Sequence, residues 1–369
     1  MDKTTRRTRK EKGEVFNAAP GDKVVVGFDV HKKTYNAGVR KNSELAATWV
    51  MPHDDKAVVK MLLPSRDVIQ SVVYEAGPTG YGLARELQTA GLPVSVVAPG
   101  KTPQAANADN KSDRLDCKKL AEYEEKGLLR YVAIPTVQED AQRAVIRQRD
   151  SLCNKKSSIK HQIKSFLLYH SIEAPEGLDT WSLGSLAKLR TIRLTFDLRA
   201  TLDSLLNELD FYKGEISKVE KKISSIINKG HSALDNLLRT HPGVGPQTSH
   251  HFIMEIFSSE RFENKRQVAA YVGLAPKINR SGGGYKSGGR LRGGRKKLRD
   301  CLIEASWRWI AKDEEARKIY NRLLKNSGEA KCAITAMARR MLVSLWTMSQ
   351  TGECYHSPEP ASHEQALKD

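Results

Sequence analysis

The chain has 369 residues, of which 39% are hydrophobic, and its formal net charge is +18. This length is sufficient for two or three domains with cores of their own. No apolar run is long enough to cross a membrane, so we expect a soluble, cytoplasmic protein without a membrane partner. A positive excess of this size predicts a polyanionic partner, above all nucleic acid. The five cysteines are scattered without a CxxC pair, which favours reduced thiols over a zinc site.

The first part of the chain is predicted to be a basic arm followed by an α/β domain. Residues 1–22 are expected to form a flexible arm, because they contain the basic run RRTRK and no apolar segment. Residues 23–137 predict three consecutive strands and then strands that alternate with helices. The strands are expected at 23–30, 34–40, 44–51, 71–77, 92–99 and 131–135, and the helices at 80–91 and 113–127. This order indicates a mixed sheet with helices packed on it.

The rest of the chain is predicted to be mainly helical. Residues 138–232 contain two long amphipathic stretches, 139–170 and 198–230, which fit an antiparallel coiled-coil pair or, equally, ordinary helices of a globular domain. Residues 233–350 predict a helical domain that is interrupted by a basic, glycine-rich loop at 277–299, a segment without any acidic residue. The polar tail 351–369 is expected to be disordered.

Four acidic residues stand where a metal site could form. Asp29 and Glu75 follow apolar strands, and Asp113 and Asp116 share one face at the start of a helix. If the two strands are neighbours, the four carboxylates converge at one sheet edge, where they would suit Mg²⁺ and the cleavage of a phosphodiester. Ordinary roles also fit. Asp29 could pair with Lys32, Glu75 could stabilise the next helix, and the last two acids could form a capping box.

Two glycine-containing segments indicate contact with phosphate. PGVGPQTS has the form of a helix-hairpin-helix turn, in which Gly243 and Gly245 would let backbone N–H groups approach a phosphate, although any tight turn between helices has the same form. In NRSGGGYKSGGRLRGGRKK, Ser281 and Ser287 each precede a glycine among cations that could activate a serine nucleophile. The residues alone favour a flexible loop that binds the DNA backbone. The candidate backbone contacts are Lys277, Arg280, Lys286, Arg290, Arg292 and Arg295.

Several motifs in register resemble DEDD-type insertion-sequence transposases, a group that includes the Piv invertase and the bridge-RNA-guided recombinases. GFDVHK, YEAGPTGYGL, VVAPGKTPQ, KSDRLDCKKLA and GLLRYVAIP are similar to the N-terminal domain of that family. HPGVGPQTS, RFENKRQVAAYVGLAP, NRSGGG and KLRDCLIEAS are similar to its C-terminal domain. The resemblance covers about residues 24–345. The chain departs from it at His31 and Ser112, where the family often has Ser and Thr.

The resemblance implies a fold, a site and a set of partners. It implies an RNase H-like (RuvC-type) N-terminal domain, a helical middle segment and a mainly α C-terminal transposase domain. It implies that Asp29, Glu75, Asp113 and Asp116 bind Mg²⁺ and that Ser281 forms a covalent phosphoserine link to DNA, with Ser287 as a second candidate. Family members form dimers or tetramers, and many use a structured guide RNA that pairs with donor and target DNA.

We therefore expect a DNA transposase or site-specific recombinase that acts through Mg²⁺ and a serine nucleophile. One alternative is a junction-resolving nuclease, in which the acids activate water and the serine takes no part. The other is a nucleic-acid-binding protein without catalytic activity. Replacement of Ser281 separates the two enzymes, and replacement of Asp29 separates both from the binding protein.

Overall fold

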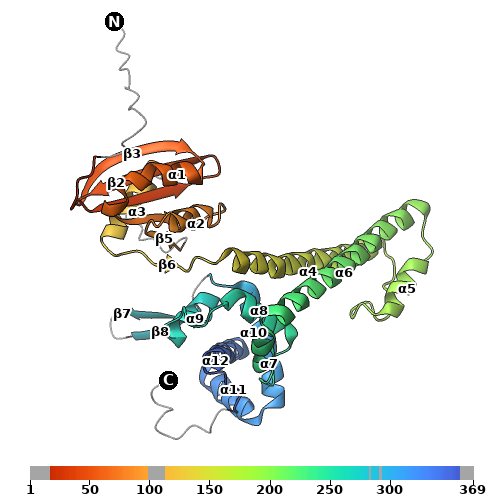
Figure 1. Cartoon of the computed structure of the whole chain (residues 1–369). Helices are drawn as coiled ribbons and strands as arrows, with labels where there is room; N and C mark the ends of the chain where they lie inside the picture. The colour runs from red at the N-terminus through yellow and green to blue at the C-terminus, as the bar shows by residue number, and fades with distance from the viewer. Residues whose placement is uncertain (1–16, 99–112, 282–283, 291–292, 358–369) are drawn as a thin grey trace. The chain divides into compact units, whose positions relative to one another are not determined.

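The structure is a computed structural model that describes residues 17–98, 113–281, 284–290 and 293–357. For residues 113–115, 277–281 and 284–290 the description is confined to the backbone. The chain divides into two compact units, Met1–Thr136 and Val137–Asp369, each with hydrophobic cores of its own (Figure 1).

The N-terminal unit is built on a six-stranded mixed sheet with the strand order β3-β2-β1-β4-β5-β6. β1, β4 and β5 are parallel, β2 pairs antiparallel with both β1 and β3, and β6 pairs antiparallel with β5. The strands are β1 Val24–Val30, β2 Thr34–Lys41, β3 Glu44–Pro52, β4 Ile69–Glu75, β5 Val94–Val97 and β6 Tyr131–Val132. The prediction of a mixed α/β sheet is therefore confirmed.

Helices pack on both faces of this sheet. Phe28 and Tyr74 lie in a core shared with α1 (Asp55–Leu62) and α2 (Gly82–Thr89), and the 3-10 helix η1 (Leu63–Val68) follows α1. On the other face Val73 and Val97 pack against Leu120 of α3 (Asp113–Glu125). Because side chains alternate along a strand, this division assigns each residue of β1 and β4 to one face or the other.

The C-terminal unit begins with two long helices that run side by side, α4 (Val137–Tyr169) and α6 (Phe196–Gly230), with α5 (Leu183–Thr191) in the segment that joins them (Figure 1). Around that segment they share a core of their own, which includes Ile163 and Leu206. At the other end Ile146 and Ile223 belong to the core of the helices that follow, so the pair and those helices form one unit. Coiled-coil packing within the pair stays a prediction.

Six helices complete this unit around a large apolar core that includes Trp309 and Met341. They are α7 Ser232–Leu238, α8 Pro246–Ile256, α9 Lys265–Val272, α10 Lys296–Lys312, α11 Glu314–Ser327 and α12 Ala330–Thr351. Their ends follow ordinary capping rules. The Asn264 side chain accepts hydrogen bonds at the start of α9, and Gly273 ends that helix with a left-handed φ of +82°.

The basic glycine-rich segment contains a two-stranded antiparallel hairpin where we expected a flexible loop. Its strands are β7 (Pro276–Ser281) and β8 (Gly284–Arg290). The runs KINR and GYKS hold Ile278 and Tyr285, residue types that favour strands. The many glycines concealed this pattern in the sequence.

Candidate catalytic site

Two of the predicted acids stand at the ends of neighbouring parallel strands. β1 and β4 pair in register up to Phe28 and Tyr74. Asp29 and Glu75 are the next residues on each strand, so they occupy adjacent positions at the carboxyl end of the sheet. Since Phe28 and Tyr74 face α1 and α2, alternation places Asp29 and Glu75 on the face that α3 covers. The neighbouring strands that the sequence analysis required are therefore present.

The helix that covers these acids approaches the sheet closely because two glycines face it. A Cβ atom at Gly27 would lie 2.3 Å from the carbonyl oxygen of Cys117. One at Gly38, the partner of Gly27 in register, would meet the same helix at 3.1 Å. Asp29 is two positions after Gly27 on the same strand face. It therefore lies beside the segment of α3 that holds Asp116.

The first turn of α3 carries the other two predicted acids. Asp113 is the first residue of the helix, and Asp116 is exposed one turn later. Burial raises the pKa of the neighbouring Cys117 thiol, and the negative charge of Asp29 raises it further. Asp29 and Glu75 are thus neighbours at one edge of the sheet, and α3, whose first turn carries Asp113 and Asp116, covers the face on which they lie.

A histidine that the sequence analysis did not assign to the site contacts the first acid. His31 Nε2 lies 2.9 Å from Asp29 Oδ2, and the Asp29 side chain is 22% exposed. His31 was noted only as a departure from the family pattern. Its position two residues after the acid, where the chain turns out of β1, is the signal that could have identified it.

A second layer of polar side chains holds the turn that carries His31. His53 Nδ1 donates to the His31 carbonyl oxygen at 2.8 Å, and His53 Nε2 lies 3.0 Å from Tyr35 Oη. The Tyr35 hydroxyl also donates to Asp55, and burial together with this bond raises the Tyr35 pKa. The network therefore ties the turn to the start of α1. It could not be found from the sequence, because only the register of β2 and β3 brings these residues together.

The donor chemistry of the acidic edge suits a hard divalent cation. Carboxylate oxygens of Asp29, Glu75 and Asp116 are the ligand type that Mg²⁺ prefers. Among the side chains that the structure describes, however, no group of three or more His, Cys, Asp or Glu residues is close enough together to hold a metal ion. The Asp113 side chain falls outside that description. The residues fit the metal by chemical type and by strand position, and the complete ligand set stays a prediction.

The two candidate serines occupy different positions in the β7–β8 hairpin. Ser281 is the last residue of β7 and pairs with Gly284, so it lies beside the tip. Ser287 pairs with Ile278, closer to the base. A residue beside a hairpin tip is better placed to meet a distant phosphate than one along the ribbon, and this position favours Ser281.

The predicted contacts to the nucleic-acid backbone are spread over three places. Lys277, Arg280, Lys286 and Arg290 lie on the two strands of the hairpin. Arg292 lies outside the described residues. Arg295 Nε donates to Tyr271 Oη at 3.0 Å and lies 3.4 Å from Glu255 Oε2, so its guanidinium is engaged within the protein.

The predicted phosphate-binding turn between α7 and α8 is packed into the protein. Gly243 is buried, its N–H donates to His241 Nδ1, and a Cβ atom there would lie 2.4 Å from the carbonyl oxygen of Ala305. Gly245 is half-buried and precedes the first residue of α8. Close helix packing thus explains Gly243, and phosphate contact at this turn stays a prediction.

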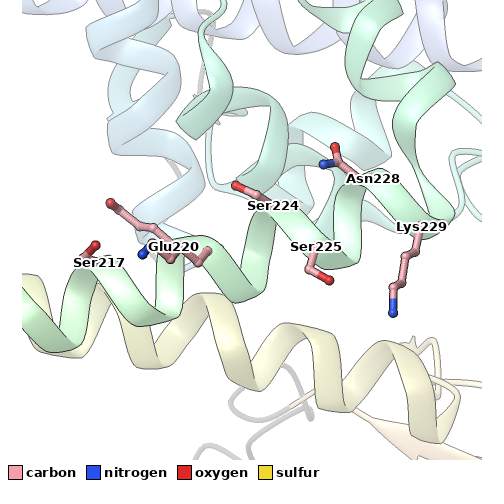
Figure 2. A pocket seen from close by; sticks show the side chains of 7 residues that line it. Ser217, Glu220, Ser224, Ser225, Asn228 and Lys229 are labelled. Atoms are coloured by element: carbon pink, nitrogen blue, oxygen red, sulfur yellow. The ribbon is translucent and has the colours of Figure 1, made fainter.

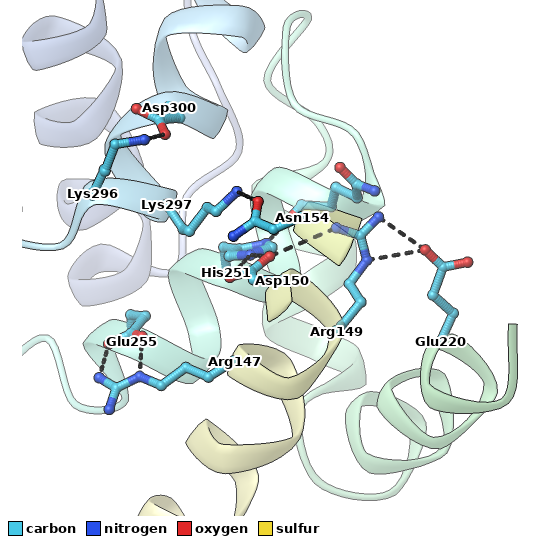
Figure 3. Close-up of polar contacts among 11 residues, drawn as sticks. Arg147, Arg149, Asp150, Asn154, Glu220, His251, Glu255, Lys296, Lys297 and Asp300 are labelled. Atoms are coloured by element: carbon cyan, nitrogen blue, oxygen red, sulfur yellow. Dashed lines mark hydrogen bonds and ion pairs between the residues drawn. The ribbon is translucent and has the colours of Figure 1, made fainter. Parts of the chain in front are cut away.

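One buried and one partly exposed ion pair connect α4 to α8 in the C-terminal unit (Figure 3). His251 Nε2 lies 3.1 Å from Asp150 Oδ1, and Arg147 Nε lies 3.1 Å from Glu255 Oε1. Burial lowers the His251 pKa, but the hydrogen bonds that the ring donates to Asp150 and Cys301 outweigh it and raise that pKa to about 10. These pairs join α4 to α8, and none of them resembles a catalytic arrangement.

A polar hollow of about 580 Å³ lies along α6 (Figure 2). It is lined by Ser217, Glu220, Lys221, Ser224, Ser225, Asn228 and Lys229. All of these residues belong to one helix, and none of them is a predicted site residue. The hollow offers no enclosed space for a substrate.

Comparison with known proteins shows which transposases the chain resembles. One family model, described as the transposase IS116/IS110/IS902 family, matches residues 235–321, and a model of the DEDD transposases of IS110 type matches residues 26–171. Both models describe transposases of the IS110 type, so the chain is similar to IS110-type DEDD transposases over each of these two stretches. It is therefore an enzyme of the DNA transposase class, and the acidic edge and the hairpin each lie within one of the two matched regions.

Individual relatives agree with this assignment. The chain is 28% identical over 313 residues to y4rJ of Sinorhizobium fredii, a protein named as a transposase, covering 76% of this chain and 77% of that one. It is 28% identical over 255 residues to the transposase for insertion sequence element IS1533 of Leptospira borgpetersenii, covering 67% and 73%. For the transposase of IS1111A from Coxiella burnetii the identity is 22% over 289 residues, covering 77% and 79%.

A solved structure matches at a much lower level. Thermus thermophilus RuvC in complex with a Holliday junction substrate is 16% identical, with a TM-score of 0.23, covering 30% of this chain and 99% of that one. Because the TM-score is this low, the match supports no argument about this chain. None of the helices in the described parts of the chain has both the length and the apolar character needed to cross a membrane.

Proposed function

We propose that this transposase cuts and rejoins DNA through Mg²⁺ held by Asp29, Glu75, Asp113 and Asp116 and through a covalent link to Ser281. The observation that carries the proposal is the adjacent placement of Asp29 and Glu75 at the ends of two parallel strands, on the face that α3 covers. The mixed sheet and the resemblance support an RNase H-like catalytic domain, and a cytoplasmic location follows as an expectation.

The acids have one role and the serine another. Bound Mg²⁺ would neutralise charge on the scissile phosphate and make its phosphorus more electrophilic. Asp29 and Glu75 would supply oxygen ligands from the rigid sheet, and Asp113 and Asp116 from α3. His31, at 2.9 Å from Asp29 Oδ2, would orient that carboxylate.

The covalent step conserves the energy of the phosphodiester. Ser281 Oγ forms a bond to phosphorus, its proton passes to water, and the bond from phosphorus to one deoxyribose oxygen breaks. That oxygen takes up a proton from water and leaves as a hydroxyl. Attack of a different DNA hydroxyl on the phosphoserine then reverses the exchange and releases the serine. No external energy source is required.

The test compares two serines in one hairpin. Purified full-length protein with its co-purifying RNA is incubated with labelled donor DNA and Mg²⁺, and adducts are separated on a denaturing protein gel. We expect Ser281→Ala to reduce the adduct at least about 100-fold and Ser287→Ala to retain it. Asp29→Asn should reduce it to a similar degree. An adduct that persists in Ser281→Ala and disappears in Ser287→Ala would identify Ser287 as the nucleophile instead.

The water-activating nuclease is the competing enzyme. It predicts that Ser281→Ala still cleaves DNA in Mg²⁺ without forming an adduct, and this result would replace the serine mechanism. Loss of cleavage in Asp29→Asn is common to both mechanisms. DNA binding without any cleavage, in the wild-type protein with cognate DNA, would instead support a binding role.

Two partners belong to the proposal beside donor and target DNA. The resemblance supports a structured guide RNA, and the net charge of +18 suits a second polyanion. The resemblance also supports a homodimer or homotetramer. Ribonuclease treatment before the adduct assay tests the first partner, and light scattering of the purified complex tests the second.

A further inference from the structure

The β7–β8 hairpin joins the helices of the C-terminal unit through a stem, the two chain segments Val272–Gly273 and Gly293–Gly294. The chain leaves α9 at Gly273, forms β7 and β8, and returns to α10 at Gly294. The two glycines are in contact: a Cβ atom at Gly294 would lie 2.5 Å from the backbone nitrogen of Gly273. An isolated two-stranded ribbon is marginally stable in water, so its orientation depends on how this base is held.

One buried arginine connects the two sides of the stem. Arg299, on the first turn of α10, is 5% exposed. Its Nη1 donates to the carbonyl oxygen of Val272 on the outgoing side and to that of Gly293 on the returning side, each at 3.0 Å. A single guanidinium nitrogen therefore bridges the two points between which the hairpin is closed.

The glycines make this bridge possible. Gly273 has a φ of +82°, and a Cβ atom there would lie 2.5 Å from both Arg299 Nη1 and the Gly293 carbonyl oxygen. Gly294 has a φ of +81°. A side chain at Gly273 would displace the guanidinium, and one at Gly294 would push against the backbone of Val272 and Gly273, so either would separate the two sides.

A second contact holds the same base from α8. Arg295, one residue after Gly294, donates from Nε to Tyr271 Oη, and the Tyr271 hydroxyl donates to the Glu255 carbonyl oxygen at 3.1 Å. The stem is thus bound to α8 and α10, two helices of the rigid core.

We propose that Arg299 is a positioning residue that, with Gly273 and Gly294, clasps the stem of the β7–β8 hairpin and thereby sets where Ser281 meets the scissile phosphate. This inference rests on the proposed role of Ser281. Being buried, Arg299 acts on the hairpin and not on DNA. Displacement of a nucleophile by about 1 Å can lower a rate about 100-fold, so a loosened stem slows chemistry more than binding.

The first test opens the stem without changing charge. Gly294→Ala inserts a methyl group against backbone, and Gly328→Ala is its control, because Gly328 has a left-handed φ of +69° with nothing within 4 Å. We expect Gly294→Ala to lower the rate of adduct formation by about 10- to 100-fold at saturating DNA, with little change in the DNA concentration for half-maximal rate. Gly328→Ala should keep the wild-type rate.

The second test removes the bridge itself. Arg299→Met removes the donors and Arg299→Lys restores an ammonium that can reach the carbonyls in part, so we expect a large loss and a partial rescue. Arg317→Met is the matched control, since Arg317 also donates to two backbone carbonyls, those of Ile310 and Ala311, at the opposite end of α10.

A measurement without DNA separates this inference from the function on which it rests. Hydrogen–deuterium exchange of peptides covering residues 276–290 should quicken in Gly294→Ala and Arg299→Met while exchange in α12 stays unchanged. If these variants keep wild-type rates of exchange and of adduct formation, Arg299 and the two glycines do not position the hairpin. Quickened exchange in α12 as well would also overturn the inference, because the residues would then support the whole fold. If Ser281→Ala keeps its adduct, the proposed nucleophile fails, whatever the exchange shows.

Discussion

The backbone of Cys117 lies directly against the α-carbon of Gly27, so that a Cβ atom at position 27 would lie 2.3 Å from the Cys117 carbonyl oxygen. This contact sets the height of α3 above the sheet. It thereby links a glycine of the first strand to the helix that carries Asp113 and Asp116.

Replacement of Gly27 by alanine should push α3 away from the sheet. The new methyl group would meet backbone atoms on a helix, which cannot move as a flexible side chain does, so we expect a loss of about 1–3 kcal/mol in unfolding free energy. Denaturant unfolding measures it. Gly77→Ala is the control, since the shortest contact of its Cβ would be 3.9 Å. An equal loss of unfolding free energy in both variants would show that the close approach of α3 to Gly27 does not cause the destabilisation.

Replacement of His31 should weaken metal use without removing it. His31→Ala deletes the group that contacts Asp29 Oδ2, so the carboxylate loses an orienting partner. We expect the Mg²⁺ concentration for half-maximal cleavage to rise by about 10-fold, the lower end of the effect of such outer partners. His31→Gln should restore part of the affinity. A drop in maximal rate with unchanged Mg²⁺ dependence would argue for a different role.

The sequence was sufficient to predict the central sheet, because its strands are runs of apolar residues. Val24, Val26 and Phe28 are fully buried, as are Val72 and Tyr74. Asp29 and Glu75 were found for the same reason, since a carboxylate at the end of such a run is conspicuous.

Other elements gave weaker signals. α1 was not predicted, although Asp54 caps it by accepting from the Ala57 N–H, because its eight residues follow β3 closely. α11 was likewise missed, although Asp313 caps it by accepting from the Ala316 N–H and its apolar residues Ala316, Ile319, Tyr320 and Leu323 recur at helical spacing. The His53 contact to the turn at His31 joins residues 22 positions apart, and only strand register brings them together.

Replacement of Asp150 should destabilise the C-terminal unit in a pH-dependent manner. Both ring nitrogens of His251 face acceptors, Gln247 O and the Asp150 carboxylate, which suits a charged imidazolium with a pKa of about 10. Since this pKa is above the unfolded value near 6.5, the stabilisation is complete below pH 6.5 and is lost as the pH rises towards 10. Asp150→Asn should therefore cost about 3 kcal/mol near pH 6 and less at pH 9.

Thermal unfolding at several pH values measures this effect. Asp179→Asn is the control, because the Asp179 side chain is 97% exposed in its pair with Lys164 and should contribute little. A destabilisation in Asp150→Asn that does not change between pH 6 and 9 would show that His251 is not charged in the folded state.

Acid should destabilise the same unit through a different histidine. His241 is fully buried against the rings of Trp309 and Tyr355, and burial lowers its pKa to about 4. The folded state therefore resists protonation, and stability falls by up to about 1.4 kcal/mol per pH unit between 6.5 and 4. His241→Phe should lose some stability at pH 7, since the Gly243 N–H loses its acceptor, but should flatten this decline. An equally steep decline in the variant would assign acid sensitivity to other groups.

Replacement of hairpin cations should reveal which arginines contact DNA. Each phosphate contact releases counterions, so Arg280→Gln and Lys286→Gln should each reduce the slope of log binding constant against log salt by about 1. Arg295 is engaged with Tyr271 and Glu255, so Arg295→Gln should leave the slope nearly unchanged and instead lower the thermal stability. Filter binding to duplex DNA between low and moderate salt measures the slopes. A reduced slope in Arg295→Gln would mean that this guanidinium leaves its protein partners when DNA binds, and the stem would then be part of the DNA-binding surface.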